Sequence, residues 1–424
     1  MTSLRSALVL LLPMPLLGSK VLEWEAATAY PGPARHHPIT FANETHGFLL
    51  TGSTIDQTAT SDFYMYDAAN DVWTDLSNQT GSAFPGTPRG YAYGVVLNVP
   101  LHSKAYLGLG AGETGLLNDF WEFDMVTHVW KQLANMPIEG RRHPAMNAVR
   151  KTNQGNRMED TVEQWEIHVG LGDDSGGNLN DWWIYDIATD SWEAASDLPA
   201  SPRHHPFHFS LGAYSYTGLG HSSQGIERDW FRMENRKWVA EPSFESFNEE
   251  DVLVTTEARV AGTQFSMEFN GNSSSSPTQD DSETVLLSGS MGFVLSGDGD
   301  DHRSMTEGEF HAFDPSTGRW HILPQHPGRS RWAPGSFVIR GSPVVYFTSG
   351  YDRTSQELFN DVWRIDVTPL FVEGPSNTTE TAPVSTPSNT GGMEPTSSTL
   401  IRNVRSFCLV SSFLLTIYLA SAGF

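Results

Sequence analysis

The chain has 424 residues, a formal net charge of −24, 18% charged residues, 11% aromatic residues and 38 glycines. The negative charge argues against a nucleic-acid partner, because binding to phosphates needs a basic surface. The aromatic and glycine content argues against global disorder and suits a tightly turned all-β protein. The single cysteine, Cys408, lies near the C-terminal end, so disulfide bonds cannot stabilise the rest of the chain.

The N-terminal residues predict entry into the secretory pathway. Residues 1–19 combine Arg5, an apolar stretch from Ala7 to Leu17, and the small residues Gly18 and Ser19, which is the pattern of a cleaved signal peptide. Four Asn-x-Ser/Thr sequons predict N-glycosylation on a eukaryotic secretory route. They lie at Asn43, Asn78, Asn272 and Asn377.

One motif then recurs along the chain: an acidic residue, an alternating apolar run, a second acidic residue, a short polar turn and a tryptophan. Four full copies end at Trp73, Trp130, Trp192 and Trp320, and a shorter copy ends at Trp238. A sixth copy, at 361–367, stops before its tryptophan. The alternation has a period of two residues, which is strand geometry, so each copy predicts a β-hairpin.

Two further signals precede each hairpin. One is a strand that ends in glycine, where a positive φ is permitted. The other is an arginine, often beside histidine or proline, that opens an apolar strand; these arginines are Arg35, Arg89, Arg142, Arg203, Arg259 and Arg331. Each repeat therefore reads as four strands over about 50 residues.

This order of arginine, glycine, aromatic and tryptophan signals resembles the kelch repeat over residues 20–368, although the family's double glycine is mostly degraded here. The resemblance implies an all-β, six-bladed kelch-type β-propeller. Because the sixth copy lacks its tryptophan strand, we expect the N-terminal strand with Trp24 to complete the last blade. The polar insertion Asn270–Glu283 is expected to be a mobile loop of the fifth blade.

The C-terminal residues predict a membrane anchor. Residues 369–399 are rich in Ser, Thr and Pro and predict a disordered stalk that can carry O-glycans. The apolar tail, residues 400–424, matches a GPI-attachment signal with Asn389 as the attachment residue. Gly391 and the Ser397–Ser398 pair are alternative attachment points, and a retained transmembrane or membrane-associated tail is the alternative anchor. We expect a monomeric ectodomain at the cell surface.

The kelch resemblance also suggests a site. In kelch propellers the strand that opens each repeat is innermost, which places the six arginines as a ring at the rim of the central channel. His36, His37, His143, His204, His205 and Trp332 accompany them. Arginine suits carboxylates, so this ring is expected to bind a protein or an anionic glycan. Alternatively, the arginines are structural, and either pair with the repeated aspartates of a neighbouring blade or satisfy backbone carbonyls.

Other chemistry is less favoured by the sequence. Adjacent residues on a strand point to opposite faces, so each His-His pair supplies at most one inward ligand, and neither a metal site nor a cofactor is predicted. Asp173–Asp174 and Asp298–His302 are expected to be solvated turns. Copper-radical oxidases of the family need a tyrosine cross-linked to cysteine, which this ectodomain lacks.

The sequence therefore favours binding over catalysis. A sugar mutarotase or isomerase is the alternative that the resemblance leaves open, with His143, His204 or His205 as the base. A purely structural surface protein is the second alternative.

Overall fold

The computed structural model describes residues 22–97, 103–151, 164–248, 250–275, 285–300 and 302–372. The predicted signal peptide, Asn377, Asn389, the apolar tail and almost all of the predicted stalk lie outside these ranges. Within them, no helix has the length and apolar character needed to cross a bilayer. A short 3₁₀ helix, η2 (Thr368–Leu370), follows the last strand.

The fold is all-β and consists of small sheets whose strands are mostly antiparallel, as the alternating sequence pattern predicts. Four sheets follow the chain in simple order. The first contains β2 (Ile39–Ala42), β3 (His46–Leu50), β4 (Phe63–Asp67) and β5 (Val72–Asp75). The second contains β6 (Tyr93–Val96), β7 (Lys104–Gly108), β10 (Phe120–Asp124) and β11 (Val129–Leu133). The third contains β12 (Ala145–Arg150), β13 (Trp165–Gly170), β16 (Trp182–Asp186) and β17 (Ser191–Ala195). The fourth contains β19 (Phe207–Leu211), β20 (Tyr214–Gly218), β23 (Trp230–Glu234) and β24 (Lys237–Glu241).

The fifth sheet is larger than the others. It contains β27 (Thr263–Ser275), β28 (Val285–Leu295), β29 (Gly308–Asp314) and β30 (Arg319–His326), extended by β25 (Ser246–Phe247) and β26 (Leu253–Val254). The pairing of β25 with β30 is parallel. The predicted loop Asn270–Glu283 is corrected in its first part, because strand β27 continues to Ser275 and pairs with β28 across a register shift. Residues 276–283 lie outside the described ranges.

The last sheet joins the two ends of the described chain. It contains β31 (Gly335–Val338), β32 (Val344–Thr348), β35 (Val362–Asp366) and the N-terminal strand β1 (Trp24–Ala27). Strand β1 pairs antiparallel with β35, with Trp24 opposite Ile365. The indole Nε1 of Trp24 also donates to the Pro324 carbonyl in the fifth sheet, at 2.9 Å. The expected pairing of the N-terminal strand with the last sheet is confirmed.

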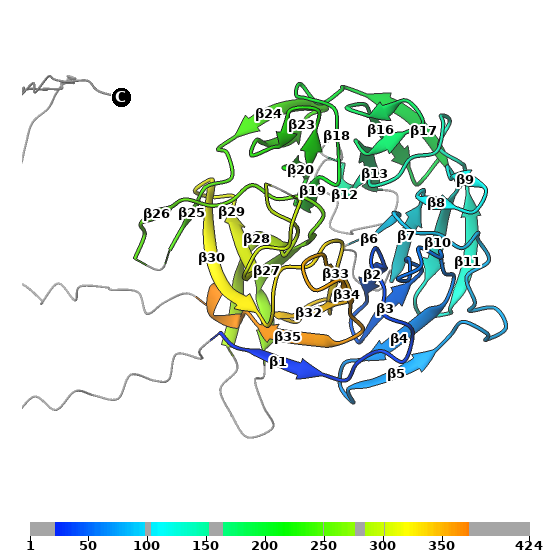
Figure 1. Cartoon of the computed structure of the whole chain (residues 1–424), viewed down its shortest axis with the longest axis horizontal. Helices are drawn as coiled ribbons and strands as arrows, with labels where there is room; N and C mark the ends of the chain where they lie inside the picture. Colours follow the sequence, from blue (N-terminus) through cyan, green and yellow to red (C-terminus); the bar gives the residue numbers. More distant parts are fainter. Residues whose placement is uncertain are drawn as a thin grey trace, which may run out of the picture. The chain divides into compact units, whose positions relative to one another are not determined.

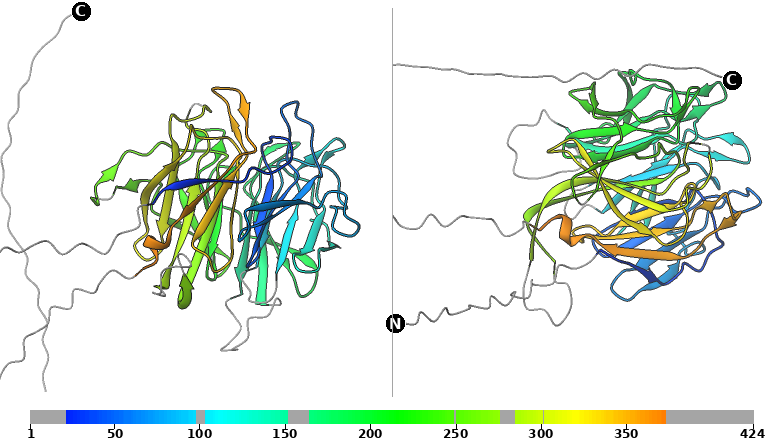
Figure 2. Two further views of the ribbon diagram at one scale, coloured as in Figure 1. Left: turned by 90° about the horizontal axis from the view of Figure 1, so that it is seen from below. Right: turned by 60° about the vertical axis from the view of Figure 1, so that its left-hand side comes forward.

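One edge strand of each of these six sheets contacts an edge strand of the next sheet. β2 contacts β6, β6 contacts β12, β12 contacts β19, β19 contacts β27, β27 contacts β31, and β31 contacts β2. Figure 1 shows the sheets arranged around the middle of the molecule, and the views in Figure 2 show them packed face to face. This arrangement is consistent with a β-propeller-like fold.

The repeated aromatic residues hold neighbouring sheets together. The first aromatic residue of a motif packs against the tryptophan of the next sheet, as in Phe120 with Trp192, whose ring centroids are 5.1 Å apart. Most of these tryptophans donate their indole N–H to a carbonyl on or just after the outer strand of the preceding sheet: Trp73 to Thr28, Trp130 to Ser82, Trp192 to Ala134 and Trp238 to Ser196. The motif therefore recurs because each sheet needs the same two aromatic groups to pack on its neighbours.

Four short hairpins lie beyond the ends of the inner strands. They are β8 (Ala111–Gly112) with β9 (Gly115–Leu116), β14 (Asp173–Asp174) with β15 (Gly177–Asn178), β21 (His221–Ser222) with β22 (Gly225–Ile226), and β33 (Tyr351–Asp352) with β34 (Glu357–Leu358). Strand β18 (Arg203–His204) pairs with β21. We call the face of the fold that carries these hairpins the histidine face, since His36, His37, His143, His204 and His205 lie beside them.

Candidate functional site on the histidine face

The histidine face has the same three-residue pattern in all six repeats. The first residue is an arginine. The second forms a β-bridge with the loop after the inner hairpin, as His36 does with Ser53, Arg142 with Asp173 and Trp332 with Tyr351. The third has a left-handed backbone; these residues are His37, Tyr91, His143, His205, Ala261 and Ala333. Every residue of the predicted site occupies one of these three positions.

The first residue of each pattern is a buried arginine that is paired within its own repeat. Each guanidinium pairs with the acidic residue that opens the recurring motif of its own repeat. The pairs are Arg35–Asp62, Arg89–Asp119, Arg141–Asp181, Arg203–Asp229, Arg259–Glu309 and Arg331–Asp361. In all six pairs a guanidinium nitrogen also donates to a backbone carbonyl, for example Arg89 to Leu109 at 3.1 Å. All six arginine side chains are at most 4% exposed.

The predicted arginine ring is therefore corrected. Arg35, Arg89, Arg203, Arg259 and Arg331 are buried and engaged by their own acidic partners, so a ligand cannot reach them. The third member is Arg141 rather than Arg142, because only Arg141 occupies the first position of the pattern. The alternative of a structural ring was the better interpretation, although the partners come from the same repeat and not from a neighbouring one.

These ion pairs also affect the protonation of the acids. Burial by itself would raise the pKa of Asp119, but the hydrogen bond and charge of Arg89 outweigh it and hold that pKa below its usual value. Asp181 is held low by Arg141 in the same way. The Arg89–Asp119 and Arg141–Asp181 pairs are thus fixed, ionised links between the innermost turn and the aromatic strand.

The third residues form a ring of backbone contacts at the centre of the face. The N–H of His37 donates to the Ala333 carbonyl at 2.8 Å, and Ala333 donates to Ala261 at 2.6 Å. On the other side, His143 donates to the Tyr91 carbonyl at 3.0 Å. A left-handed backbone is costly for a residue with a side chain, and such strain is found where the surrounding structure fixes it. Here it directs the side chains of His37, His143 and His205 towards one another.

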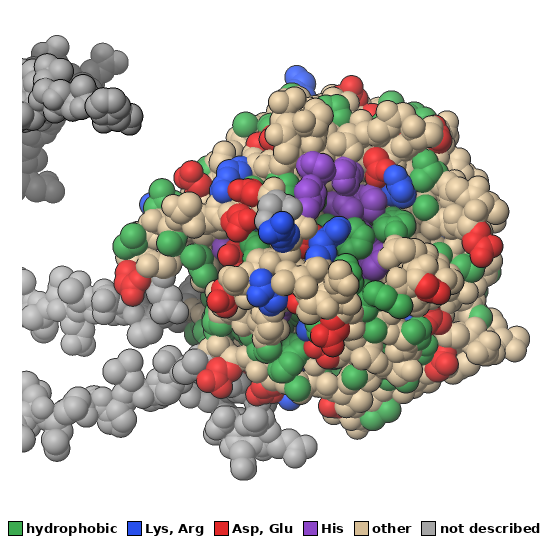
Figure 3. Space-filling model, viewed as in Figure 1, with side chains coloured by type: hydrophobic (Ala, Val, Ile, Leu, Met, Phe, Trp, Pro, Cys, Tyr) green, Lys and Arg blue, Asp and Glu red, His purple; other side chains and the backbone are tan. Residues whose placement is uncertain are grey.

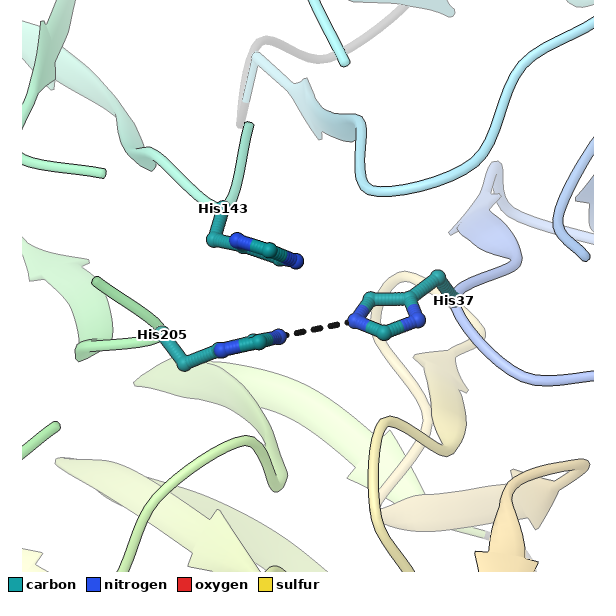
Figure 4. A group of neighbouring side chains, drawn as sticks. All are labelled: His37, His143 and His205. Carbon is teal, nitrogen blue, oxygen red and sulfur yellow. Dashed lines mark hydrogen bonds between the residues drawn. The ribbon is translucent and has the colours of Figure 1, made fainter. Parts of the chain in front are cut away.

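The imidazole rings of His37, His143 and His205 lie close together. His37 Nε2 and His205 Nε2 are 2.8 Å apart, and the His143 and His205 ring centroids are 3.5 Å apart. Figure 4 shows the three rings converging from three separate segments. His143 Nδ1 lies 2.7 Å from an Asp173 carboxylate oxygen, and Arg142 pairs with the same carboxylate.

All of these imidazoles are held in the neutral form. Burial lowers the pKa of His36 and of His204 to about 4, and it lowers those of His37 and His205 well below the ordinary value. Burial also lowers the pKa of His143, although Asp173 opposes the effect. At neutral pH these groups therefore offer nitrogen lone pairs rather than positive charge.

A pocket of about 550 Å³ opens over this cluster. Its lining includes Tyr91, Arg142, His143, Asp173, His204, His205, Trp332 and Arg353. Figure 3 shows the histidines gathered near the middle of this face, with basic and acidic side chains beside them. The Arg353 guanidinium lies 4.4 Å from the Trp332 ring centre and pairs with Asp298 at 2.6 Å.

The structure thus brings together five of the predicted rim residues: Arg142, His143, His204, His205 and Trp332. It also uses residues that the sequence interpretation missed. Asp173 and Asp298, expected in solvated turns, are both buried and ion-paired, which corrects that expectation. Asp173 follows a glycine-ended strand beside an Arg-His pair, and that proximity was the available signal.

The described sequons differ in exposure. Asn78 is exposed. Asn43 is 6% exposed, and its Oδ1 accepts the backbone N–H of Thr45 at 2.9 Å and of His46 at 2.7 Å. Asn272 lies on strand β27.

Comparisons with known proteins do not assign this chain to a family. No protein-family model matches the sequence, and no curated protein sequence matches it significantly. The resemblance to the kelch repeat therefore stays a prediction from the repeats, and function is argued below from the site.

Proposed function

We propose that the described residues form a six-bladed propeller of the kelch type, with each sheet as one blade. Two observations support this: the same three-residue pattern occurs six times on the histidine face, and β31 contacts β2 as well as β27. We also propose that the chain is secreted and held at the cell surface. That part rests on the sequence of residues 1–19 and 400–424 alone.

We infer that the protein is an extracellular binding module whose ligand site is the pocket on the histidine face. The observation that carries this is that five of the lining residues come from four different repeats. Tyr91, Arg142, His204, Trp332 and Arg353 converge on one opening. Pockets with a few convergent polar groups beside aromatic rings are the usual form of a ligand site.

The charges of the pocket favour a neutral glycan over a polyanion. Arg142 is paired with Asp173, and Arg353 with Asp298, so neither brings unbalanced positive charge. An Arg–Asp pair at a pocket wall presents both donors and acceptors, which is what sugar hydroxyls need. The rings of Trp332 and Tyr91 are half-buried and add apolar surface for the faces of sugar rings.

The test is a binding measurement on the full chain, expressed in a eukaryotic secretory host and purified in mild detergent. Neutral oligosaccharides and their uronic-acid counterparts are screened, and hits are measured by calorimetry at two salt concentrations. We expect saturable, weakly salt-dependent binding to a neutral oligosaccharide. Trp332→Ala and Arg142→Ala should each weaken it at least about tenfold.

The control variant is Arg319→Ala, an exposed arginine that lies outside the pocket and pairs with Asp251. It should bind as the wild type does. Unchanged affinity in folded Trp332→Ala and Arg142→Ala would contradict the proposed site. Binding confined to acidic oligosaccharides and lost in salt would contradict the preference for a neutral ligand.

One observation favours a second candidate, acid–base chemistry on a sugar. His143 is oriented by Asp173 through the 2.7 Å contact, which is how a catalytic base is commonly held. Mutarotation of a reducing sugar, followed by polarimetry, tests this directly. A rate that is no faster than in buffer would exclude it.

A further inference from the structure

The three converging histidines have the composition of a metal site. Their candidate ligand nitrogens all lie within 4.8 Å of one another, and all three residues are buried. Each comes from a different repeat, so the cluster forms only when three sheets are in place (Figure 4). The expectation from the sequence, that each His-His pair supplies one inward imidazole, describes His37 and His205 well, but the third ligand comes from His143.

His143 has the orientation of a metal ligand. Its Nδ1 is held by Asp173 at 2.7 Å, and its buried Nε2 has no hydrogen-bond partner among the described residues. A histidine that binds a metal through one nitrogen usually gives the other to a carboxylate or carbonyl, which fixes the ring. An unpartnered buried nitrogen is otherwise unfavourable, so a ligand at this atom would explain it.

The contact between His37 and His205 places two further ring nitrogens close together, beside the unpartnered Nε2 of His143. Their Nε2 atoms are 2.8 Å apart, and a neutral pair can place only one proton between them. Two nitrogens on one tetrahedral zinc ion would be about 3.3 Å apart, given a Zn–N distance of about 2.0–2.1 Å. A small opening of this contact, with a tilt of the His143 ring away from His205, would therefore accommodate the ion.

The donor set also indicates which metal fits. Three neutral imidazoles suit Zn²⁺ or Cu²⁺ and do not suit Ca²⁺ or Mg²⁺, which prefer oxygen ligands. His143 and His205 also line the pocket, so a fourth ligand position would be reached from it. We propose that His37, His143 and His205 bind one divalent transition-metal ion, with Asp173 as the residue that orients His143. This inference does not depend on the identity of the pocket's ligand.

The test uses the full chain without a histidine tag, stripped with chelator and titrated with Zn²⁺ alone by calorimetry. Co²⁺ serves as a spectroscopic probe, because tetrahedral nitrogen coordination gives visible absorption bands. We expect one Zn²⁺ per chain and a higher melting temperature in its presence. His143→Ala and His205→Ala should each weaken binding by at least about 100-fold, and Asp173→Asn by about 10–100-fold.

His321→Ala, which changes a histidine outside the cluster, is the matched control and should bind as the wild type does. Every variant is compared by its melting temperature without metal, so that loss of fold is distinguished from loss of a ligand. A wild-type chain that shows no saturable binding of Zn²⁺ or Cu²⁺ overturns the proposal. So does binding that persists unchanged in a folded His143→Ala or His205→Ala variant.

Discussion

Arg141 and Arg142 are adjacent in the sequence but face different environments. Arg141 is fully buried and pairs through two nitrogens with Asp181, at 2.8 and 2.9 Å. The Arg142 side chain is 40% exposed and pairs with Asp173 at the wall of the pocket. The first arginine links an inner turn to an aromatic strand, while the second belongs to the proposed binding site.

This difference predicts that two neighbouring substitutions change the free energy of unfolding by different amounts. Arg141→Ala leaves the Asp181 carboxylate without its buried partner and should lower the free energy of unfolding by roughly 3 kcal/mol. Arg142→Ala should change it by less than about 1 kcal/mol, because the Arg142 side chain is 40% exposed and His143 still contacts the Asp173 carboxylate. Urea denaturation of both variants measures this. Equal losses of stability in the two variants would contradict the assignment of Arg141 as structural and Arg142 as part of the binding site.

Two buried histidines outside the pocket predict an acid-sensitive fold. Burial lowers the pKa of His208 and of His326 to about 3, against 6.5 in an exposed side chain. Between pH 3 and pH 6.5 the unfolded chain binds more protons at these histidines than the folded chain does. The free energy of unfolding is therefore highest above pH 6.5 and decreases as the pH falls. The slope reaches about 1.4 kcal/mol per pH unit for each histidine.

Unfolding free energies at pH 7.5, 6.5 and 5.5 test this pH dependence. His208→Gln removes one titrating group and should reduce the slope below pH 6.5, with no change of slope above it. A wild-type stability that is flat from pH 7.5 to 5.5 would show that these imidazoles are not held neutral by burial.

The pairing of the two chain ends predicts a stabilising role for Trp24. Its ring packs against Phe310 and Phe347, at 5.8 and 6.1 Å between centroids. Trp24→Ala should lower the unfolding free energy by roughly 2–3 kcal/mol through lost packing. Glu25→Ala, on the exposed side of the same strand, should cost less than about 1 kcal/mol. A Trp24→Ala variant that melts as the wild type does would mean that the last sheet does not need the N-terminal strand.

Gly172 should tolerate no side chain, because it lies directly beneath the pocket wall. Its φ is +88°, and an added Cβ would lie 2.3 Å from the Arg142 carbonyl oxygen. Gly177 has a φ of +122° but open space around it. Substitution of Gly177 therefore measures the cost of backbone strain without steric overlap. We expect Gly172→Ala to cost roughly 3 kcal/mol and Gly177→Ala roughly 1 kcal/mol in thermal unfolding. Equal melting temperatures of the Gly172→Ala and Gly177→Ala variants would contradict the close packing of Gly172 against the Arg142 carbonyl.

Local signals in the sequence predicted the strands well. The period-two alternation and the recurring tryptophan are properties of single hairpins, so they indicate β4, β10, β16 and β23 without any knowledge of tertiary contacts. The pairing of β1 with β35 followed from one missing tryptophan strand and one spare tryptophan at the N-terminus. The extension of β27 past Asn270 was missed, because a polar Asn-Ser run does not look like a strand until its partner β28 is known.

The site was harder to predict because it depends on backbone conformation and on contacts between repeats. Nothing in the pair Arg141-Arg142 reveals which residue precedes the β-bridge, and the left-handed backbone at His37, His143 and His205 has no signature in residues other than glycine. One clue was available: the acid that opens each aromatic motif, such as Asp181, recurs as regularly as the arginines. That recurrence was the basis of the alternative of a structural ring, which placed the paired acids in a neighbouring blade.

The most direct test of the binding proposal is a crystal structure of the protein with a neutral oligosaccharide that the binding screen identifies. We expect a sugar ring to pack against Trp332, with its hydroxyl groups hydrogen-bonded to the Arg142–Asp173 pair. A sugar bound on the outer strands or on the opposite face, with this pocket unaltered, would contradict the assignment of the histidine face as the functional surface.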